Sequence, residues 1–358
     1  MSIDFLVRRD DLSQCGVEDS GDPELEPGQV LLEIDAFALT ANNVTYGVFG
    51  DALSYWNFFP APEGWGRIPA FGFADVVAGP DHALPAGARL FGYLPMSTEL
   101  VVTPGEIGEH GFVDAAPHRA AMAPVYNQYL RVDNDPRHEP RYEDRQMLLR
   151  PLFLTSFLID DWLEENDFFG ASTVVVSSAS SKTSIGTAFQ IRDREEVETI
   201  GLTSAANRDF VAGLDVYDSV ATYDEIDALP DGRAVYVDVS GSGSVRGAVH
   251  RHFGPNLAHS SAVGGAHWDQ VGEDPGELPG PAPQMFFAPD HVKRRTRDWG
   301  QEGFQARTAE AWAEFVPWTE GWLEVEHGRG PEAVERVYRQ LLAGETSPSV
   351  GHVLSLSR

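Results

Sequence analysis

The chain has 358 residues, of which 42% are hydrophobic and 23% charged, and it contains one cysteine. This composition is typical of a folded globular protein and excludes wholesale disorder, a disulfide framework and a cysteine-rich zinc site, and no apolar run is long enough to span a membrane. Asp and Glu total 55 against 26 Lys and Arg, and the net charge of −29 disfavours nucleic acid and anionic membranes as partners.

The first third of the chain predicts a β-rich unit. Residues 1–20 are polar and charged, as in an edge strand or arm, and lack the apolar segment of a secretion signal, so we expect a cytoplasmic protein. Short strand-like segments separated by Gly/Pro turns follow at 29–39, 68–79, 89–95 and 99–104. They indicate a barrel-like unit over roughly residues 1–115.

The rest of the chain predicts two helices, followed by alternating strands and helices. We expect helices over residues 118–131 and 142–165. Buried strands are predicted at 173–176, 198–202, 219–223, 234–239 and 258–263. Their alternation with helices indicates βαβ units and a parallel sheet. Helices at 290–324 and 332–342 and a strand at 351–356 close the chain.

The turn after the first buried strand carries the clearest functional signal. The run TVVV at 173–176 ends in SSASSKTS, and a helix follows. The first N–H groups of a helix and its dipole attract anions, and small hydroxyl side chains allow a phosphate to approach closely. Lys182, one of only two lysines in the chain, adds a positive charge. We therefore predict that Ser180, Ser181, Lys182 and Thr183 hold the pyrophosphate of a dinucleotide.

Two other interpretations of this turn stay open, because serines stand where a dinucleotide fold usually has glycines. Lys182 and Thr183 resemble the end of a P-loop, although Ser181 replaces the glycine that precedes the lysine in that motif. A Ser-rich bend that binds nothing is the second alternative.

The end of the second buried strand predicts which coenzyme is bound. In a dinucleotide fold this position reaches the adenosine ribose, and an acidic residue there favours NAD. The chain instead has Thr203, Ser204, Asn207 and Arg208, which do not repel a 2′-phosphate. We therefore predict NADP(H) rather than NAD(H), with a solvated helix residue as the alternative role for Arg208.

The order of these segments resembles the medium-chain dehydrogenase/reductase superfamily, in its zinc-less, quinone-oxidoreductase-like branch. The resemblance rests on segments spread over most of the chain, among them GQVLLEIDAFALTANNVTYGVFG (28–50), LPAGARLFGY (84–93), VYVDVSG (235–241) and GHVLSL (351–356). The segments YWNFFP (55–60) and SSASSKTSIG (177–186) also resemble an uncharacterised bacterial family, a domain of unknown function, within that superfamily.

The resemblance implies a two-domain α/β protein. A GroES-like β-barrel domain over residues 1–150, completed by 290–358, would accompany a Rossmann-type doubly wound domain over 151–289. Ser240, Gly264 and Gly265 would lie at later strand ends, where ligands of open sheets bind. The superfamily also implies a homodimer.

No metal site is expected, because the chain lacks the catalytic cysteine of zinc-dependent members and its histidines lack metal-binding spacing. Donor side chains must then stabilise the charge that hydride transfer develops. The resemblance implies that Asn43 and Tyr46 lie in the substrate turn, where Asn43 would donate a hydrogen bond to a substrate oxygen and Tyr46 would donate the proton. A helix cap for Asn43 and a packing role for Tyr46 are equally good interpretations. Tyr55, Trp56, Phe59 and Tyr126 are predicted to line an apolar substrate cleft; burial under the C-terminal helices or a subunit contact is the alternative.

These features predict zinc-independent, NADP(H)-dependent hydride transfer to a hydrophobic activated alkene, quinone or carbonyl compound. A lyase or retro-aldol enzyme on the same fold is one alternative. A non-catalytic binding protein that retains the fold is another.

Overall fold

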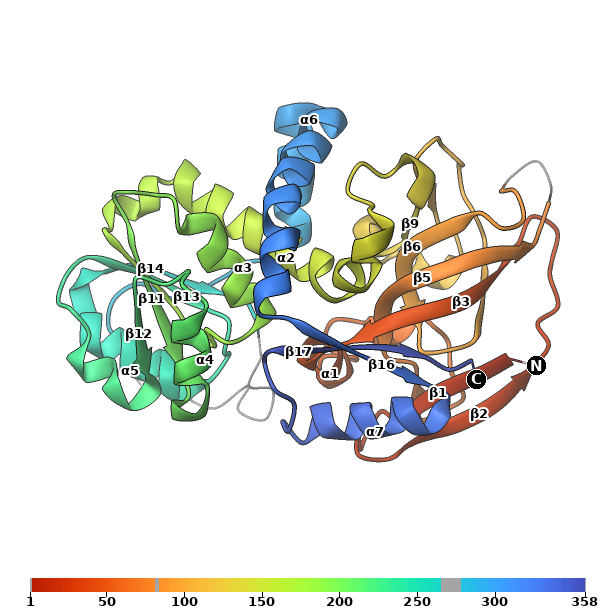
Figure 1. The fold of residues 1–358 in the computed structure, drawn as a ribbon, viewed down its shortest axis with the longest axis horizontal. Coiled ribbons are helices and arrows are strands. Elements are labelled where there is room, and N and C mark those ends of the chain that lie inside the picture. The colour runs from red at the N-terminus through yellow and green to blue at the C-terminus, as the bar shows by residue number, and fades with distance from the viewer. Residues whose placement is uncertain (1, 81–83, 265–277, 358) are drawn as a thin grey trace. The chain divides into compact units, whose positions relative to one another are not determined.

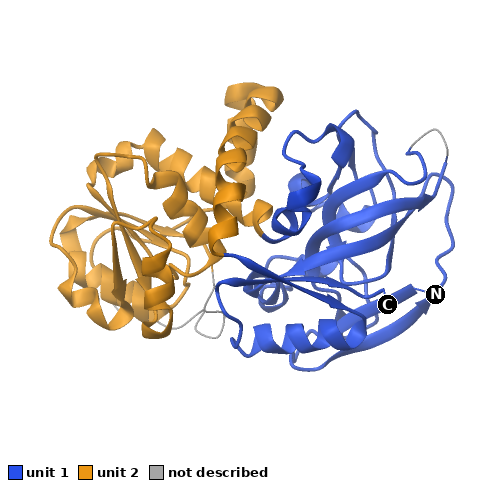
Figure 2. Ribbon diagram, viewed as in Figure 1, with its two compact units in different colours: residues 1–148, 323–358 blue, residues 149–322 orange. Residues whose placement is uncertain are grey.

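The computed structural model describes residues 2–80, 84–264 and 278–357, and the chain folds into two compact units (Figure 2). Unit 1 comprises residues 1–148 and 323–358, and unit 2 comprises residues 149–322. Among the described residues, no helix is long and apolar enough to cross a membrane.

Unit 1 is built around antiparallel β-structure (Figure 1). A three-stranded sheet has the order β2-β1-β4, formed by Cys15–Gly21, Ser2–Arg8 and Trp65–Gly66. The larger sheet has the order β16-β17-β3-β5-β6-β9-β8, with β7 also paired to β3. Its strands are β3 (Val30–Leu39), β5 (Pro69–Ala78), β6 (Arg89–Pro95), β7 (Glu99–Val102), β8 (Gly111–Val113), β9 (Gln128–Arg131), β16 (Glu324–Arg329) and β17 (Val350–Ser355).

Two helices and several short 3₁₀ turns complete unit 1. Helix α1 spans Ala41–Val48, and the amphipathic helix α7 spans Pro331–Leu342. Tyr338 of α7 packs edge-on against Phe5 of β1 and donates a 2.8 Å hydrogen bond to the carbonyl of Leu12. This contact fixes α7 along the N-terminal hairpin.

The prediction of a helix over residues 118–131 is wrong. The segment forms the 3₁₀ turns η2 (Pro117–Arg119) and η3 (Pro124–Tyr126), and strand β9 follows. Each 3₁₀ turn begins at a proline, which suits the first position of a short helical turn. In β9 the buried Tyr129 lies between the exposed Gln128 and the less buried Leu130, which is the two-residue alternation of a strand.

Unit 2 contains a six-stranded parallel sheet, as the sequence predicts. Its order is β12-β11-β10-β13-β14-β15, which is that of a doubly wound Rossmann-type sheet. The strands are β10 (Thr173–Val176), β11 (Glu198–Thr203), β12 (Ser219–Thr222), β13 (Ala234–Asp238), β14 (Leu257–Ala262) and β15 (Gln284–Met285).

Apolar residues bury this sheet on both faces, which explains why β10 and β13 are continuous apolar runs. Val174 and Val176 of β10 pack against one cluster that includes Leu158 and Phe304, whereas Val175 packs into a second cluster that includes Val249. The covering helices are α2 (Glu143–Glu165), α3 (Lys182–Ile191), α4 (Arg208–Gly213), α5 (Gly243–Phe253) and α6 (Ala288–Trp318).

Helix α6 belongs to unit 2, whereas the sequence prediction returns the chain to the first domain at residue 290. Unit 1 resumes only at Leu323. Phe153 of α2 contacts Trp312 and Phe315 of α6, with ring centroids 5.5 and 4.5 Å apart, and Phe189 of α3 also contacts Phe315. This aromatic packing joins α6 to the helices of unit 2.

Candidate functional site

The candidate site lies at the carboxyl ends of β10 and β13 in unit 2. β10 pairs with β11 on one side and with β13 on the other, so the strand order reverses at this point. Open α/β sheets bind ligands at such a switch point, because the loops after the two strands separate there.

The Ser-rich turn leads from β10 directly into α3. Ser181 is the N-cap of α3, and its hydroxyl oxygen accepts a 3.3 Å hydrogen bond from the N–H of Ser184. The Ser184 hydroxyl in turn donates to the carbonyl of Ser177 at 2.9 Å. Ser178 adopts a left-handed conformation with φ of +51°, which bends the chain sharply between strand and helix. The hydroxyl residues therefore hold a tight strand-to-helix turn that resembles a phosphate-binding loop.

Lys182 occupies the first position of α3 and is partly buried. Burial lowers the pKa of its ammonium group to about 8, so the group is mostly charged at neutral pH. A desolvated cation beside a helix N-terminus attracts an anion more strongly than an exposed lysine does. The structure thus places Lys182 at the predicted position, together with Ser180, Ser181 and Thr183.

A buried carboxylate that the sequence analysis missed connects this turn to β13. Asp238 ends β13 and is 1% exposed. It accepts hydrogen bonds from the hydroxyls of Ser177 and Ser240, at 3.0 and 2.8 Å, and pairs with Arg246 of α5 at 2.8 Å. The Ser177 hydroxyl oxygen also accepts bonds from the backbone N–H groups of Val239 and Ser240, both at 3.1 Å. Together these bonds hold the ends of β10 and β13 side by side.

Ser240, a predicted cofactor contact, is fully buried within this Asp238 network. Gly264 is exposed and follows β14, with its N–H directed to the carbonyl of Asp238 at 3.3 Å. Gly265 lies outside the described residues. The cofactor contacts predicted for these three residues stay predictions.

The end of β11 also reaches the Ser-rich turn. Asn207 donates a 3.1 Å hydrogen bond to the hydroxyl of Ser180, and Thr203 is buried at the end of the strand. Arg208 is exposed and bonds to both carboxylate oxygens of Glu225, at 2.8 and 2.9 Å. Glu225 follows β12, and the sequence analysis missed it, because a contact across 17 positions has no local signal. The structure therefore brings Ser180 and Asn207 together and pairs Arg208 with an acidic residue.

In unit 1, four tyrosines form an aromatic group that we call the tyrosine cluster. Its members are the predicted Tyr46, Tyr55 and Tyr126 and the unpredicted Tyr93. Tyr46 lies 4.7 Å from Tyr55 and 5.7 Å from Tyr93 between ring centroids. Burial raises the pKa of Tyr46 well above its usual value, so its hydroxyl stays protonated and is able to donate a hydrogen bond.

Asn43 is the third residue of α1 and is engaged in structural hydrogen bonds. Its side-chain oxygen accepts from the N–H and the hydroxyl of Thr40, at 2.8 and 3.1 Å, and its amide donates to the carbonyl of Pro69 at 2.8 Å. This is the capping role that the sequence left open. The catalytic role of Asn43 stays a prediction.

The other aromatic residues predicted to contact substrate pack inside unit 1. Trp56 is 2% exposed and lies so close to Gly50 and Gly66 that a methyl group at either glycine would overlap its ring. Phe59 lies beneath the guanidinium of the buried Arg119, 5.1 Å from the ring centroid. These contacts connect the segment after α1 to the core of unit 1.

Comparisons with known proteins place the chain among proteins of this architecture. The family model described as "Protein of unknown function (DUF2855)" matches residues 37–347. No curated protein sequence matches the chain.

Solved structures match nearly the whole chain at low identity. CurA from Vibrio vulnificus in complex with NADPH is 14% identical, with a TM-score of 0.65 and 99% of both chains covered. A mutant form of enoyl thioester reductase from Candida tropicalis is 10% identical, with a TM-score of 0.58 and 99% of both chains covered. The yhdH oxidoreductase from Salmonella enterica in complex with NADP is 13% identical, with a TM-score of 0.53 and the same coverage. These matches confirm the predicted fold, a GroES-like domain combined with a Rossmann-type domain.

Proposed function

The chain belongs to the DUF2855 family of proteins of unknown function, and we propose that it is an NADP(H)-dependent oxidoreductase. The observation that carries the proposal is the Ser-rich turn with Lys182 at the switch point of a Rossmann-type sheet. Two similar structures contain NADPH or NADP, which supports the choice of coenzyme.

The residues of unit 2 fit the phosphates of NADP(H). The N-terminus of α3, the hydroxyls of Ser180 and Ser181 and the ammonium of Lys182 would hold the pyrophosphate. Arg208 would pair with the 2′-phosphate, because a doubly charged phosphate competes well with the exposed carboxylate of Glu225. Bound coenzyme supplies or accepts the hydride.

We propose further that unit 1 supplies the proton. The protonated hydroxyl of Tyr46 would donate to the carbon or oxygen that gains negative charge as hydride is transferred. The rings of Tyr55 and Tyr126, which are only partly buried, offer apolar contact surface. A hydrophobic activated alkene, quinone or carbonyl compound suits this chemistry.

Zinc independence is part of the proposal. A catalytic zinc needs three protein ligands, usually from Cys, His and Glu. The described residues contain no group of three or more His, Cys, Asp or Glu side chains close enough to hold a metal ion.

We propose that the protein forms a homodimer through the edge of the unit 2 sheet. Among the described residues β15 is the last strand in that sheet, and Met285 at its end is 79% exposed. An exposed strand edge with an apolar side chain is a template for pairing with a second copy. A Met285→Glu variant should be monomeric by light scattering if this edge is the interface, and an unchanged dimer would exclude the edge.

Calorimetric titration with NADPH and NADH tests the binding step, and oxidation of NADPH in the presence of enones, quinones and aldehydes tests the chemistry. We expect NADPH to bind at least about tenfold more tightly than NADH. Equal or reversed affinities would refute the assignment of the 2′-phosphate site.

A second candidate is a protein that binds without redox chemistry, either a non-catalytic binder or a lyase. The pairing of Arg208 with Glu225 favours it, because a carboxylate already pairs with the residue predicted to bind the 2′-phosphate. NADPH that binds no more tightly than NADH, together with no turnover of any carbonyl or alkene, would support this candidate.

A further inference from the structure

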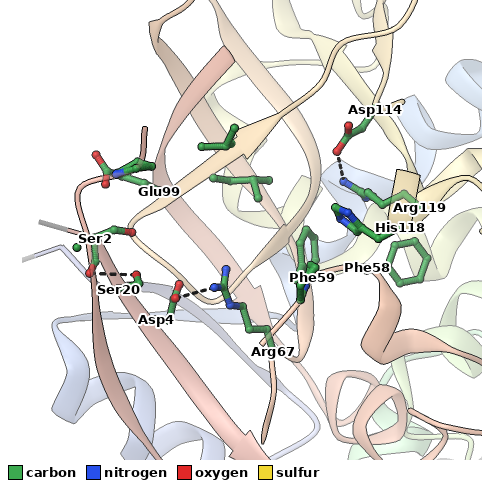
Figure 3. Close-up of a pocket in the computed structure, with 15 residues that line it drawn as sticks. Ser2, Asp4, Ser20, Phe58, Phe59, Arg67, Glu99, Asp114, His118 and Arg119 are labelled. Carbon is green, nitrogen blue, oxygen red and sulfur yellow. Dashed lines mark hydrogen bonds and ion pairs between the residues drawn. The ribbon is translucent and has the colours of Figure 1, made fainter. Parts of the chain in front are cut away.

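A pocket of about 320 Å³ lies entirely within unit 1, and Phe59 is its only lining residue that the sequence analysis assigned to a substrate cleft (Figure 3). Strands β1, β2 and β7, the segment after η1 (Tyr55–Asn57) and the η2 turn contribute to its wall. Pockets for small molecules have volumes of roughly 300 to 1,000 Å³, so this one suits a small ligand.

Both arginines of the pocket are already neutralised. Arg67 pairs with Asp4 at 2.8 Å and Arg119 pairs with Asp114 at 2.9 Å, as the dashed lines in Figure 3 indicate. The two carboxylates are nearly inaccessible, with 5% and 2% of their side chains exposed. The Nε–H of Arg67 has no acceptor among the described residues, but the charge of each arginine is balanced, so the pocket offers no net positive charge to an anionic ligand.

Glu99 of β7 provides the remaining carboxylate. Its Oε2 atom is buried and accepts no hydrogen bond from the residues that the structure describes. A buried carboxylate oxygen without a donor is costly unless a ligand supplies one. The Oε2 atom of Glu99 therefore lacks a hydrogen-bond donor that a ligand could supply.

The neighbouring strand increases the negative charge at Glu99. Glu33 of β3 is directly opposite Glu99 in the antiparallel pair. Asp75 of β5, opposite Glu33, is already paired with Arg89 at 3.1 Å and adds little. Like charges at directly opposed positions repel. His118 at the pocket adds no positive charge at neutral pH, because partial desolvation and the adjacent Arg119 lower its pKa. A cation bound at Glu99 would offset this repulsion.

Apolar residues complete the wall. Pro60, Leu100 and Val101 line the same pocket, and their accessible surfaces suit a ligand with an apolar body. A metal ion fits poorly, since Ca²⁺ and Mg²⁺ need several oxygen ligands and the arginines already hold Asp4 and Asp114.

We propose that this pocket binds a small organic ammonium compound, a protonated amine with an aromatic or aliphatic body, whose ammonium group pairs with Glu99. The apolar body lies against Pro60, Leu100 and Val101. The proposal does not depend on the coenzyme, because every residue that it uses is in unit 1.

The test uses the full chain without coenzyme and the probe 2-phenylethylammonium, with 2-phenylethanol as a neutral probe of the same shape. Calorimetry or ligand-detected NMR at low ionic strength measures both affinities. We expect the amine to bind about tenfold or more tightly than the alcohol, which is the effect of one charge-assisted hydrogen bond. Equal binding of the two probes, or no binding of the amine, would overturn the proposal.

Two variants locate the site. Glu99→Gln should remove the preference for the amine, whereas Glu106→Gln, the same change at an exposed residue of unit 1, should leave it intact. Unfolding curves establish that both variants are folded. Retention of the preference in a folded Glu99→Gln variant would assign the amine to another site. The comparison of the two probes on the unaltered protein decides the question if Glu99→Gln does not fold.

Discussion

Arg208 and Glu225 form an ion pair that connects the segment after β11 to the segment after β12. The Nη1 atom of Arg208 donates to both carboxylate oxygens, at 2.8 and 2.9 Å. Glu225 also accepts a 2.8 Å bond from the N–H of Thr222, which orients the carboxylate toward the arginine. The residue predicted to recognise the 2′-phosphate therefore has a competitor within the chain.

This competition predicts that substitutions at Glu225 and at Arg208 change the preference for NADPH in opposite directions. Glu225→Gln removes the negative charge and frees Arg208, so NADPH should bind about threefold more tightly while NADH changes little. Arg208→Gln should weaken NADPH about tenfold. Calorimetric titration of both coenzymes measures the ratio. A Glu225→Gln variant with unchanged preference would show that the pair lies away from the 2′-phosphate.

The two lysines of the chain provide a matched test of the pyrophosphate site. Lys182→Ala removes the partly buried ammonium at the start of α3 and should weaken NADPH binding by about 1.5–3 kcal/mol. Lys293→Ala removes an ammonium whose side chain is 66% exposed and should have no effect. Equal dissociation constants for the two variants would remove Lys182 from the site.

The lowered pKa of Lys182 predicts that NADPH binding depends on pH. The ammonium is mostly charged below its pKa of about 8 and mostly neutral above it. A pyrophosphate favours the charged form, so affinity should be highest near pH 7 and should fall as the pH rises through about 8. Lys182→Arg stays charged at these pH values and should abolish the fall. The same decline in both proteins would assign it to another group.

The buried hydrogen bonds of Asp238 predict that its substitution destabilises unit 2. Asp238→Asn breaks the buried pair with Arg246 and disturbs the bonds from Ser177 and Ser240, so the free energy of unfolding of unit 2 should decrease by about 2–4 kcal/mol. Asp227→Asn, at an exposed position, serves as the control. Denaturant titration gives both values. If the denaturation midpoint of Asp238→Asn equals that of Asp227→Asn, the hydrogen bonds of Asp238 do not stabilise unit 2.

The parts of this structure that the sequence predicts are those with a local signal. Val174, Val175 and Val176 are adjacent in the chain and buried on both faces of the sheet, so their run alone indicates a parallel strand. The Ser-rich turn follows directly, and its position before α3 is equally local.

The parts that the sequence does not predict depend on contacts between distant segments. Ser177 meets Asp238 across 61 positions and Arg208 meets Glu225 across 17, and no periodicity encodes either pair. The helix predicted over residues 118–131 is not formed for a related reason. Its Arg119 bonds to Asp114, Asn127 and Tyr129, and this buried network favours turns and a strand over a helix. Tertiary contacts override local preference at such sites.

The tyrosine cluster allows the proposed proton donor to be tested against a neighbour of the same kind. Tyr46→Phe removes the hydroxyl proposed to donate the proton and should lower kcat about a hundredfold or more, with NADPH affinity unchanged. Tyr93→Phe removes a buried hydroxyl that lies beside Tyr46 but is not the proposed donor, so turnover should be preserved. Single-turnover kinetics separates the hydride step from product release. If Tyr93→Phe slows that step while Tyr46→Phe does not, Tyr93 and not Tyr46 is the proton donor of the cluster.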